Sequence, residues 1–182
     1  NPRFPSEGSE ISASIEATPP HSLLWGSGND YTTMSDQDKF RWVEYHKWKF
    51  NASWYTGLGS GKVARDLVLH TRAKFGFLGY YNSDIGDQPF ERFYLGGDGL
   101  SGFSLDGREL VGMRGYSNNS LTPSNNEGYI GGAAYTKYTL ELRYPISKNP
   151  MASIYLMGFL EAGNTYTSLN AFDPFNVYRS AG

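Results

Sequence analysis

A single arginine at the end of a glycine-rich stretch is the residue whose type and setting most clearly suggest chemistry. Arg114 stands in the motif Met113-Arg114-Gly115-Tyr116 and is the only Lys or Arg within residues 109–136. A guanidinium is always charged, and its planar fork of N–H donors matches the geometry of a carboxylate. We therefore look first for carboxylate partners.

Two glutamates on segments of alternating polarity are the candidate partners. Glu141 shares its face with Lys137 and Arg143, and Glu161 lies on the polar face of the next such segment. Two neighbouring strands would therefore present both carboxylates to one side. By composition the two glutamates could be the acid pair of a glycosidase. No sugar-cleft signature or Gly-x-Ser-x-Gly elbow accompanies them, so we prefer an ion-pair role and expect no catalytic residue.

Five segments alternate between apolar and polar residues with a period of two, which predicts β-strands with unlike faces. They cover residues 9–18, 39–55, 66–80, 133–144 and 152–165. A glycine-rich stretch over 89–131 separates the third from the fourth, and a further segment begins at 178–182. For the cationic row of the polar faces we expect interior ion pairs with Glu16 and Glu141; the row comprises Lys47, Lys49, Arg72 and Lys74.

The composition supports an all-β domain and excludes several kinds of site. Glycine accounts for 22 of the 182 residues and aromatic residues for 16%, which favours strands over helices. The formal net charge of −2 gives no argument for nucleic-acid binding. The chain has no cysteine and three scattered histidines, so no metal site is expected. No apolar run is long enough for a transmembrane helix.

The length of the second and third segments raises the question of what covers their apolar faces. A soluble strand usually has about 5–6 residues, whereas a strand that crosses a membrane needs roughly 9–11. In a soluble sandwich the apolar face is the core, but in an outer-membrane barrel it meets lipid and polar side chains line the interior. Trp and Tyr near the segment ends favour the barrel, because amphipathic rings lie at membrane interfaces. Alternation alone leaves both folds open.

Four sequence elements in order carry a resemblance to a known family. They are Phe4-Pro5-x-x-Gly8, Phe93-x-x-Gly96-Gly97, Arg114-Gly115-Tyr116 and Phe159-x-Glu161-x-Gly163. Together they resemble the BamA family of outer-membrane assembly and translocation barrels, over essentially the whole chain. Two features depart from the family pattern: more residues separate Gly97 from Arg114, and Met113 stands where valine is usual. The path of residues 100–109 is therefore left open.

The resemblance implies an antiparallel transmembrane β-barrel, of which the chain holds about five of 16 strands as a fragment of a longer protein. It also implies that the loop over 89–131 folds inward, beginning at the motif of Phe93, Gly96 and Gly97. Because the strand registers point Glu141 and Glu161 into the lumen, the resemblance makes them the partners of Arg114. Gly115 would permit a tight turn, and the Tyr116 ring would pack while its hydroxyl finds a partner.

The function that the resemblance implies is non-enzymatic, namely folding and inserting β-barrel proteins into the outer membrane of a bacterium. The implied partners are the lipid bilayer, nascent outer-membrane clients and assembly-machinery lipoproteins, with no nucleic acid, cofactor or metal. A related translocase or secretion transporter of the same superfamily is the alternative within this fold. A secreted β-sandwich that binds glycans, or a hydrolase fused to a barrel, are the alternatives from other classes.

Overall fold

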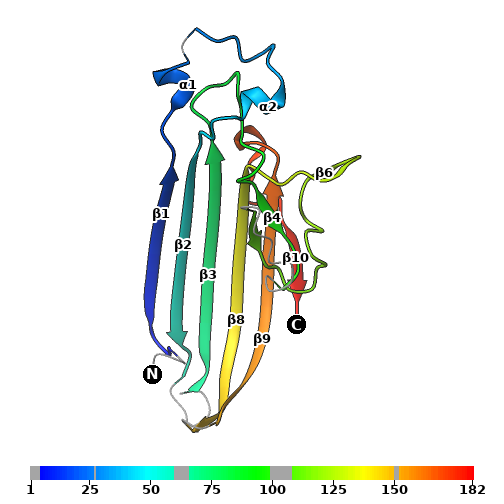
Figure 1. Cartoon of the computed structure of the whole chain (residues 1–182). Helices are drawn as coiled ribbons and strands as arrows, with labels where there is room; N and C mark the ends of the chain where they lie inside the picture. Colours follow the sequence, from blue (N-terminus) through cyan, green and yellow to red (C-terminus); the bar gives the residue numbers. More distant parts are fainter. Residues whose placement is uncertain (1–4, 27, 60–65, 99–107, 150–151) are drawn as a thin grey trace.

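Six strands form one sheet in the computed structural model, which describes residues 5–26, 28–59, 66–98, 108–149 and 152–182. Neighbouring strands follow the order β1-β2-β3-β8-β9-β10 (Figure 1). Their bounds are Gly8–Ala17, His46–Gly57, Val68–Gly79, Ala134–Asn149, Ala152–Tyr166 and Tyr178–Ala181. Every neighbouring pair in this sheet is antiparallel, so the predicted all-β antiparallel class is confirmed.

The observed strand bounds correct the predicted ones at two places. The second strand begins at His46 rather than at residue 39, because the short helix α2 (Asp36–Lys39) precedes it. The Ser35 side chain caps this helix by accepting a hydrogen bond from the Asp38 N–H, and acidic residues suit the positive end of a helix dipole. The fourth strand continues past residue 144 to Asn149. Helix capping before β2 and strand pairing at the end of β8 therefore set these bounds, and the alternation of residue types does not.

Shorter elements lie in the connections between the long strands. Helix α1 (His21–Leu24) follows β1, and the 3-10 helix η2 (Leu169–Ala171) follows β9. Between β3 and β8, β4 (Phe93–Leu95) pairs in parallel with β5 (Glu109–Val111), and β6 (Ser124–Asn125) pairs with β7 (Gly128–Tyr129). Residues 99–107 and Phe4 lie outside the described residues, so most of the 100–109 path is not described. No helix among the described residues is long and apolar enough to cross a membrane.

The sheet has a polar face and an apolar face, and the connection between β3 and β8 packs on the polar one. In Figure 1 this connection lies beside β8 and β9. The buried core lies between the connection and the sheet and comprises Leu78, Phe93, Leu95, Val111, Met113, Leu121 and Tyr135. The opposite face leaves large apolar side chains exposed, among them Ile11, Trp48, Phe50, Trp54, Leu142, Ile154 and Leu156. An exposed apolar area of this extent marks an interaction surface.

Candidate functional site

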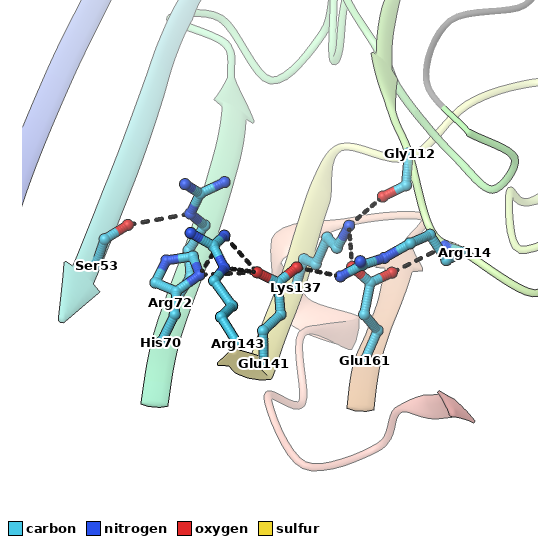
Figure 2. Close-up of polar contacts among 9 residues, drawn as sticks. All are labelled: Ser53, His70, Arg72, Gly112, Arg114, Lys137, Glu141, Arg143 and Glu161. Carbon is cyan, nitrogen blue, oxygen red and sulfur yellow. Dashed lines mark hydrogen bonds and ion pairs between the residues drawn. The ribbon is translucent and has the colours of Figure 1, made fainter. Parts of the chain in front are cut away.

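Arg114 reaches two glutamates on adjacent strands of the polar face (Figure 2). Its Nη2 lies 2.5 Å from Glu141 Oε1 on β8 and 2.7 Å from Glu161 Oε1 on β9. Its Nε and its backbone N–H also donate to Glu161, at 3.0 and 2.8 Å. The glutamate side chains are 8% and 2% exposed, against 31% for Arg114. Burial lowers the pKa of Arg114, but these hydrogen bonds outweigh it and the pKa is raised.

Glu161 is held by a second cation and lies next to an aromatic ring that also contacts Arg114. Lys137 Nζ on β8 lies 3.1 Å from Glu161 Oε1 and donates to the Gly112 carbonyl at 2.5 Å. The Arg114 guanidinium carbon stands 3.9 Å from the centre of the Phe159 ring, within the range of a cation–π contact. Strand β9 therefore supplies Arg114 with both an ionic partner, Glu161, and an aromatic partner, Phe159.

Glu141 joins Arg114 to a polar row that continues across the sheet to β3. Its second oxygen accepts from Arg143, with an Nε distance of 2.9 Å, and lies 3.0 Å from His70 Nδ1. The His70 ring stacks on Tyr55 of β2, with ring centres 4.4 Å apart and planes 4° from parallel. Every oxygen of Glu141 and Glu161 thus faces a donor, which is the condition for stable burial of a carboxylate.

The two residues after Arg114 contact the last strand, β10. Gly115 has a φ of +84°, a left-handed conformation that suits glycine, and an added Cβ would lie 3.1 Å from Ser180 Cβ. The Tyr116 hydroxyl donates to the Arg179 carbonyl at 2.8 Å. The Tyr116 ring meets Tyr178 edge to face at 6.4 Å. The motif 113–116 therefore touches β8, β9 and β10.

The loop-start motif pairs directly with the arginine motif. Met113 is fully buried, and its N–H donates to the Gly97 carbonyl at 2.7 Å, while the Gly97 N–H donates to the Tyr116 carbonyl at 3.1 Å. Gly96 has a φ of +128°, and a Cβ there would lie 2.5 Å from the Ser117 carbonyl oxygen. Phe93 is fully buried in the core. The two motifs are therefore one folded unit, in which only glycine satisfies the backbone at residue 96.

A second ionic cluster joins the base of the loop to β2. Here the cations are on the strand and the carboxylates that pair with Lys47 are in the loop, the reverse of the Arg114 site. Lys47 Nζ lies 3.3 Å from Glu91 Oε2 and 3.0 Å from Glu109 Oε2, and its side chain is 2% exposed. Lys49 lies 3.4 Å from Glu109 and 2.6 Å from Glu16. Of the pairs expected between the cationic row and Glu16 or Glu141, the described residues show only Lys49 with Glu16, because Glu141 pairs with Arg114, Arg143 and His70 instead. The partners Glu91 and Glu109 were missed. Both lie in a stretch without periodicity, so sequence patterns give no sign of where their side chains point.

The remaining expected residues of the cationic row behave differently. Arg72 Nε donates to Ser53 Oγ at 3.0 Å, and the structure gives Lys74 no hydrogen bond or ion pair among the residues that it describes. No group of three His, Asp or Glu that could hold a metal ion occurs in that same part of the chain. Chemically, the site can hold the loop 89–131 on the sheet through buried ion pairs.

Comparisons with known proteins agree with this architecture. Residues 1–180 match the Omp85 superfamily domain. Over 124 residues the chain is 29% identical to the sorting and assembly machinery component 50 homolog of Homo sapiens, a match that covers 66% of this chain and 23% of that protein. The chain therefore spans about a quarter of the length of this curated relative. The superfamily is non-enzymatic assembly and transport machinery, so the expectation of no enzyme is confirmed for the part of the protein that this chain covers. The chain belongs to the Omp85 superfamily, and its sheet forms part of an Omp85-type β-barrel of an outer membrane, bacterial or mitochondrial.

Proposed function

We propose that the chain is part of a BamA-type factor that folds β-barrel proteins and inserts them into a bacterial outer membrane. The observation that carries this proposal is the fork from Arg114 to Glu141 and Glu161. It accompanies the glycine pair at 96–97 and the Arg-Gly-Tyr tip, the motifs on which the resemblance to the BamA family rests. The similar human protein carries sorting and assembly in its name, which supports assembly rather than secretion.

In this proposal Arg114 is a lock that holds the loop 89–131 against the lumen side of the barrel wall. The guanidinium bridges carboxylates of two neighbouring strands, so the loop, β8 and β9 are tied at one point. Removing one member of a buried ion pair costs about 3–5 kcal/mol, because the remaining charge is left unpaired. Release of the loop is therefore infrequent, and the wall keeps its register while client strands are added elsewhere on the barrel.

The proposed partners follow from the same assignment. The apolar face, with side chains such as Ile11, Trp54 and Leu156 exposed, meets the lipid bilayer. Nascent outer-membrane β-barrel proteins are the clients, and assembly-machinery lipoproteins are the accessory partners. The work needs no cofactor, because strand pairing and burial in lipid drive client folding.

The test is client insertion by the full-length protein carrying Arg114→Ala. The protein is reconstituted in phospholipid vesicles, and the rate at which an unfolded β-barrel client becomes resistant to added protease is measured. We expect a severalfold slower rate, because the loop is no longer held on the wall. Arg41→Ala is the matched control, since Arg41 is an exposed arginine outside the site and should leave the rate unchanged.

Two outcomes would contradict the proposal. An unchanged insertion rate in Arg114→Ala, with the loop shown by protease sensitivity to be released, would remove the lock from the mechanism. A protein that moves a secreted substrate across the vesicle membrane but inserts no client would instead favour the transporter of the same superfamily.

A further inference from the structure

The apolar face of the sheet carries a hollow of about 450 Å³. Two adjacent cross-strand rows shape it. One row contains Ala73, Tyr138, Ala162 and Arg179, and the next contains Trp54, Thr71, Leu140 and Leu160. The two alanines lower the surface on either side of Tyr138, so the hollow spans β3, β8 and β9 and reaches Arg179 on β10. We call this feature the outward hollow.

Arg179 is the charged residue at the end of the outward hollow. It pairs with Ala162 across β9 and β10, so its side chain lies on the apolar face and is exposed. Its carbonyl accepts the Tyr116 hydroxyl, but its guanidinium has no hydrogen bond or ion pair within the ranges that the structure describes. A guanidinium on a lipid-facing surface is unfavourable unless an anion neutralises it.

Along β8 and β9 the row of Arg179 separates polar from apolar side chains, whereas on β2 the apolar face continues past this row with Phe50 and Trp48. On one side of its row lies Asn164, whose Nδ2 donates to the Asn176 carbonyl at 2.9 Å. On the other side follow Leu160, Leu156 and Ile154, exposed by 55%, 65% and 53%. In a membrane protein such a boundary coincides with the lipid headgroups, where phosphates are present.

We infer that the outward hollow binds one anionic phospholipid, with an acyl chain in the hollow and the headgroup phosphate on Arg179. The acyl chain contacts Leu140, Leu160 and the two alanines, and the guanidinium fork bonds two phosphate oxygens. The inference rests on the membership of the superfamily, which makes the apolar face a lipid contact, and not on the assembly activity. Strand β10 then carries lipid on one face and the Tyr116 contact on the other.

The experiment is native mass spectrometry of the full-length protein released from detergent micelles. The micelles contain equal amounts of phosphatidylglycerol and phosphatidylcholine with the same acyl chains. We expect the wild type to retain phosphatidylglycerol severalfold over phosphatidylcholine. Arg179→Gln should bring this ratio close to one, and Ala162→Leu should lower retention of both lipids by filling the hollow. Ala13→Leu, on the same face of β1 but outside the hollow, should change neither.

The acyl and phosphate parts of the site are tested separately. Inorganic phosphate and glycerol phosphate should fail to displace the retained lipid, because they lack the acyl chain. An Arg179→Gln protein with the wild-type lipid ratio would overturn the inference. So would displacement by inorganic phosphate alone, which identifies a plain anion site. A protein dimer that is lost in Ala162→Leu would assign the hollow to a second copy of the chain instead.

Discussion

Arg114 divides its donors unequally between its two partners. Glu161 receives the backbone N–H, Nε and Nη2 of Arg114, whereas Glu141 receives only Nη2 and is shared with Arg143 and His70. Glu161 therefore fixes the position of the arginine, and Glu141 adds charge and links the site to the rest of the polar face. A lysine could supply the charge but not this forked geometry.

Replacing Arg114 by alanine should lower the free energy of unfolding by about 3 kcal/mol, the lower end of the range for breaking a buried ion pair. The lower end applies because the Arg114 side chain is 31% exposed and water screens part of its charge. Urea unfolding of the full-length protein in micelles, followed by its heat-dependent gel mobility, measures the change. Arg114→Lys should lie between alanine and wild type. Equal unfolding midpoints for all three would show that the ion pairs contribute nothing to stability.

Tyr116→Phe should have a much smaller effect than the loss of Arg114. It removes one hydrogen bond, from the hydroxyl to the Arg179 carbonyl, but keeps the ring contact with Tyr178. A typical hydrogen bond contributes about 0.5–1.5 kcal/mol net. The same urea titration applies, with Tyr129→Phe as the control because the Tyr129 side chain is 49% exposed. A loss as large as that of Arg114→Ala would mean that the hydroxyl, and not the ion pair, holds the tip.

At the scale of elements, the phase of the long strands could be predicted from the sequence, but the structure of the loop could not. Period-two alternation suffices to place Glu141 and Glu161 on one side of adjacent strands, because successive side chains of a strand alternate. The loop has no period, so the parallel pair of β4 and β5 and the contacts of Lys47 with Glu91 and Glu109 had no sequence signal. For β10 the sequence indicated only that a further segment begins near residue 178, because four residues are too few to show a period.

Glycine at position 76 of β3 is what lets the loop base pack closely on the sheet. An added Cβ there would lie 2.2 Å from Tyr135 Cε1 and 2.8 Å from Phe93 Cζ. Gly76→Ala should therefore displace the loop base and cost about 1–3 kcal/mol, as overpacking of a core does. Faster trypsin cleavage within residues 89–131 of the full-length protein reports the displacement. Gly28→Ala is the control, because nothing lies within 4 Å of the added Cβ; equal cleavage of both variants would contradict this explanation.

Lys47→Met tests whether the second ionic cluster holds the loop base independently of Arg114. Methionine keeps most of the side-chain volume but leaves Glu91 and Glu109 without their buried cation. The two clusters share no partner, so the stability losses of Lys47→Met and Arg114→Ala should add to within about 0.5 kcal/mol. The double variant, measured by the same urea titration, checks this sum. A double variant no less stable than the worse single one would show that the loop detaches as one unit.

For the molecule as a whole, the arrangement of surfaces is the reverse of that in a soluble sandwich. The buried core lies on the polar face, under the loop, whereas most of the face with the exposed apolar side chains is left uncovered by the residues that the structure describes. Buried charge pairs tie loop to wall, and the free energy of the apolar face depends on lipid. The two faces therefore respond to opposite kinds of substitution.

Neighbouring residues of β9 provide a matched test of this arrangement. Leu156 lies on the apolar face and is 65% exposed, while Met157 lies on the polar face, directly across from Arg143 on β8. In lipid vesicles, Leu156→Glu should destabilise the full-length protein by about 2 kcal/mol, because a carboxylate there contacts hydrocarbon. Met157→Glu should be neutral or slightly stabilising, since it places a carboxylate opposite a guanidinium. Urea titration in vesicles measures both. If Met157→Glu proved the more damaging change, the polar face would be the one in contact with lipid, and the assignment of the two faces would be reversed.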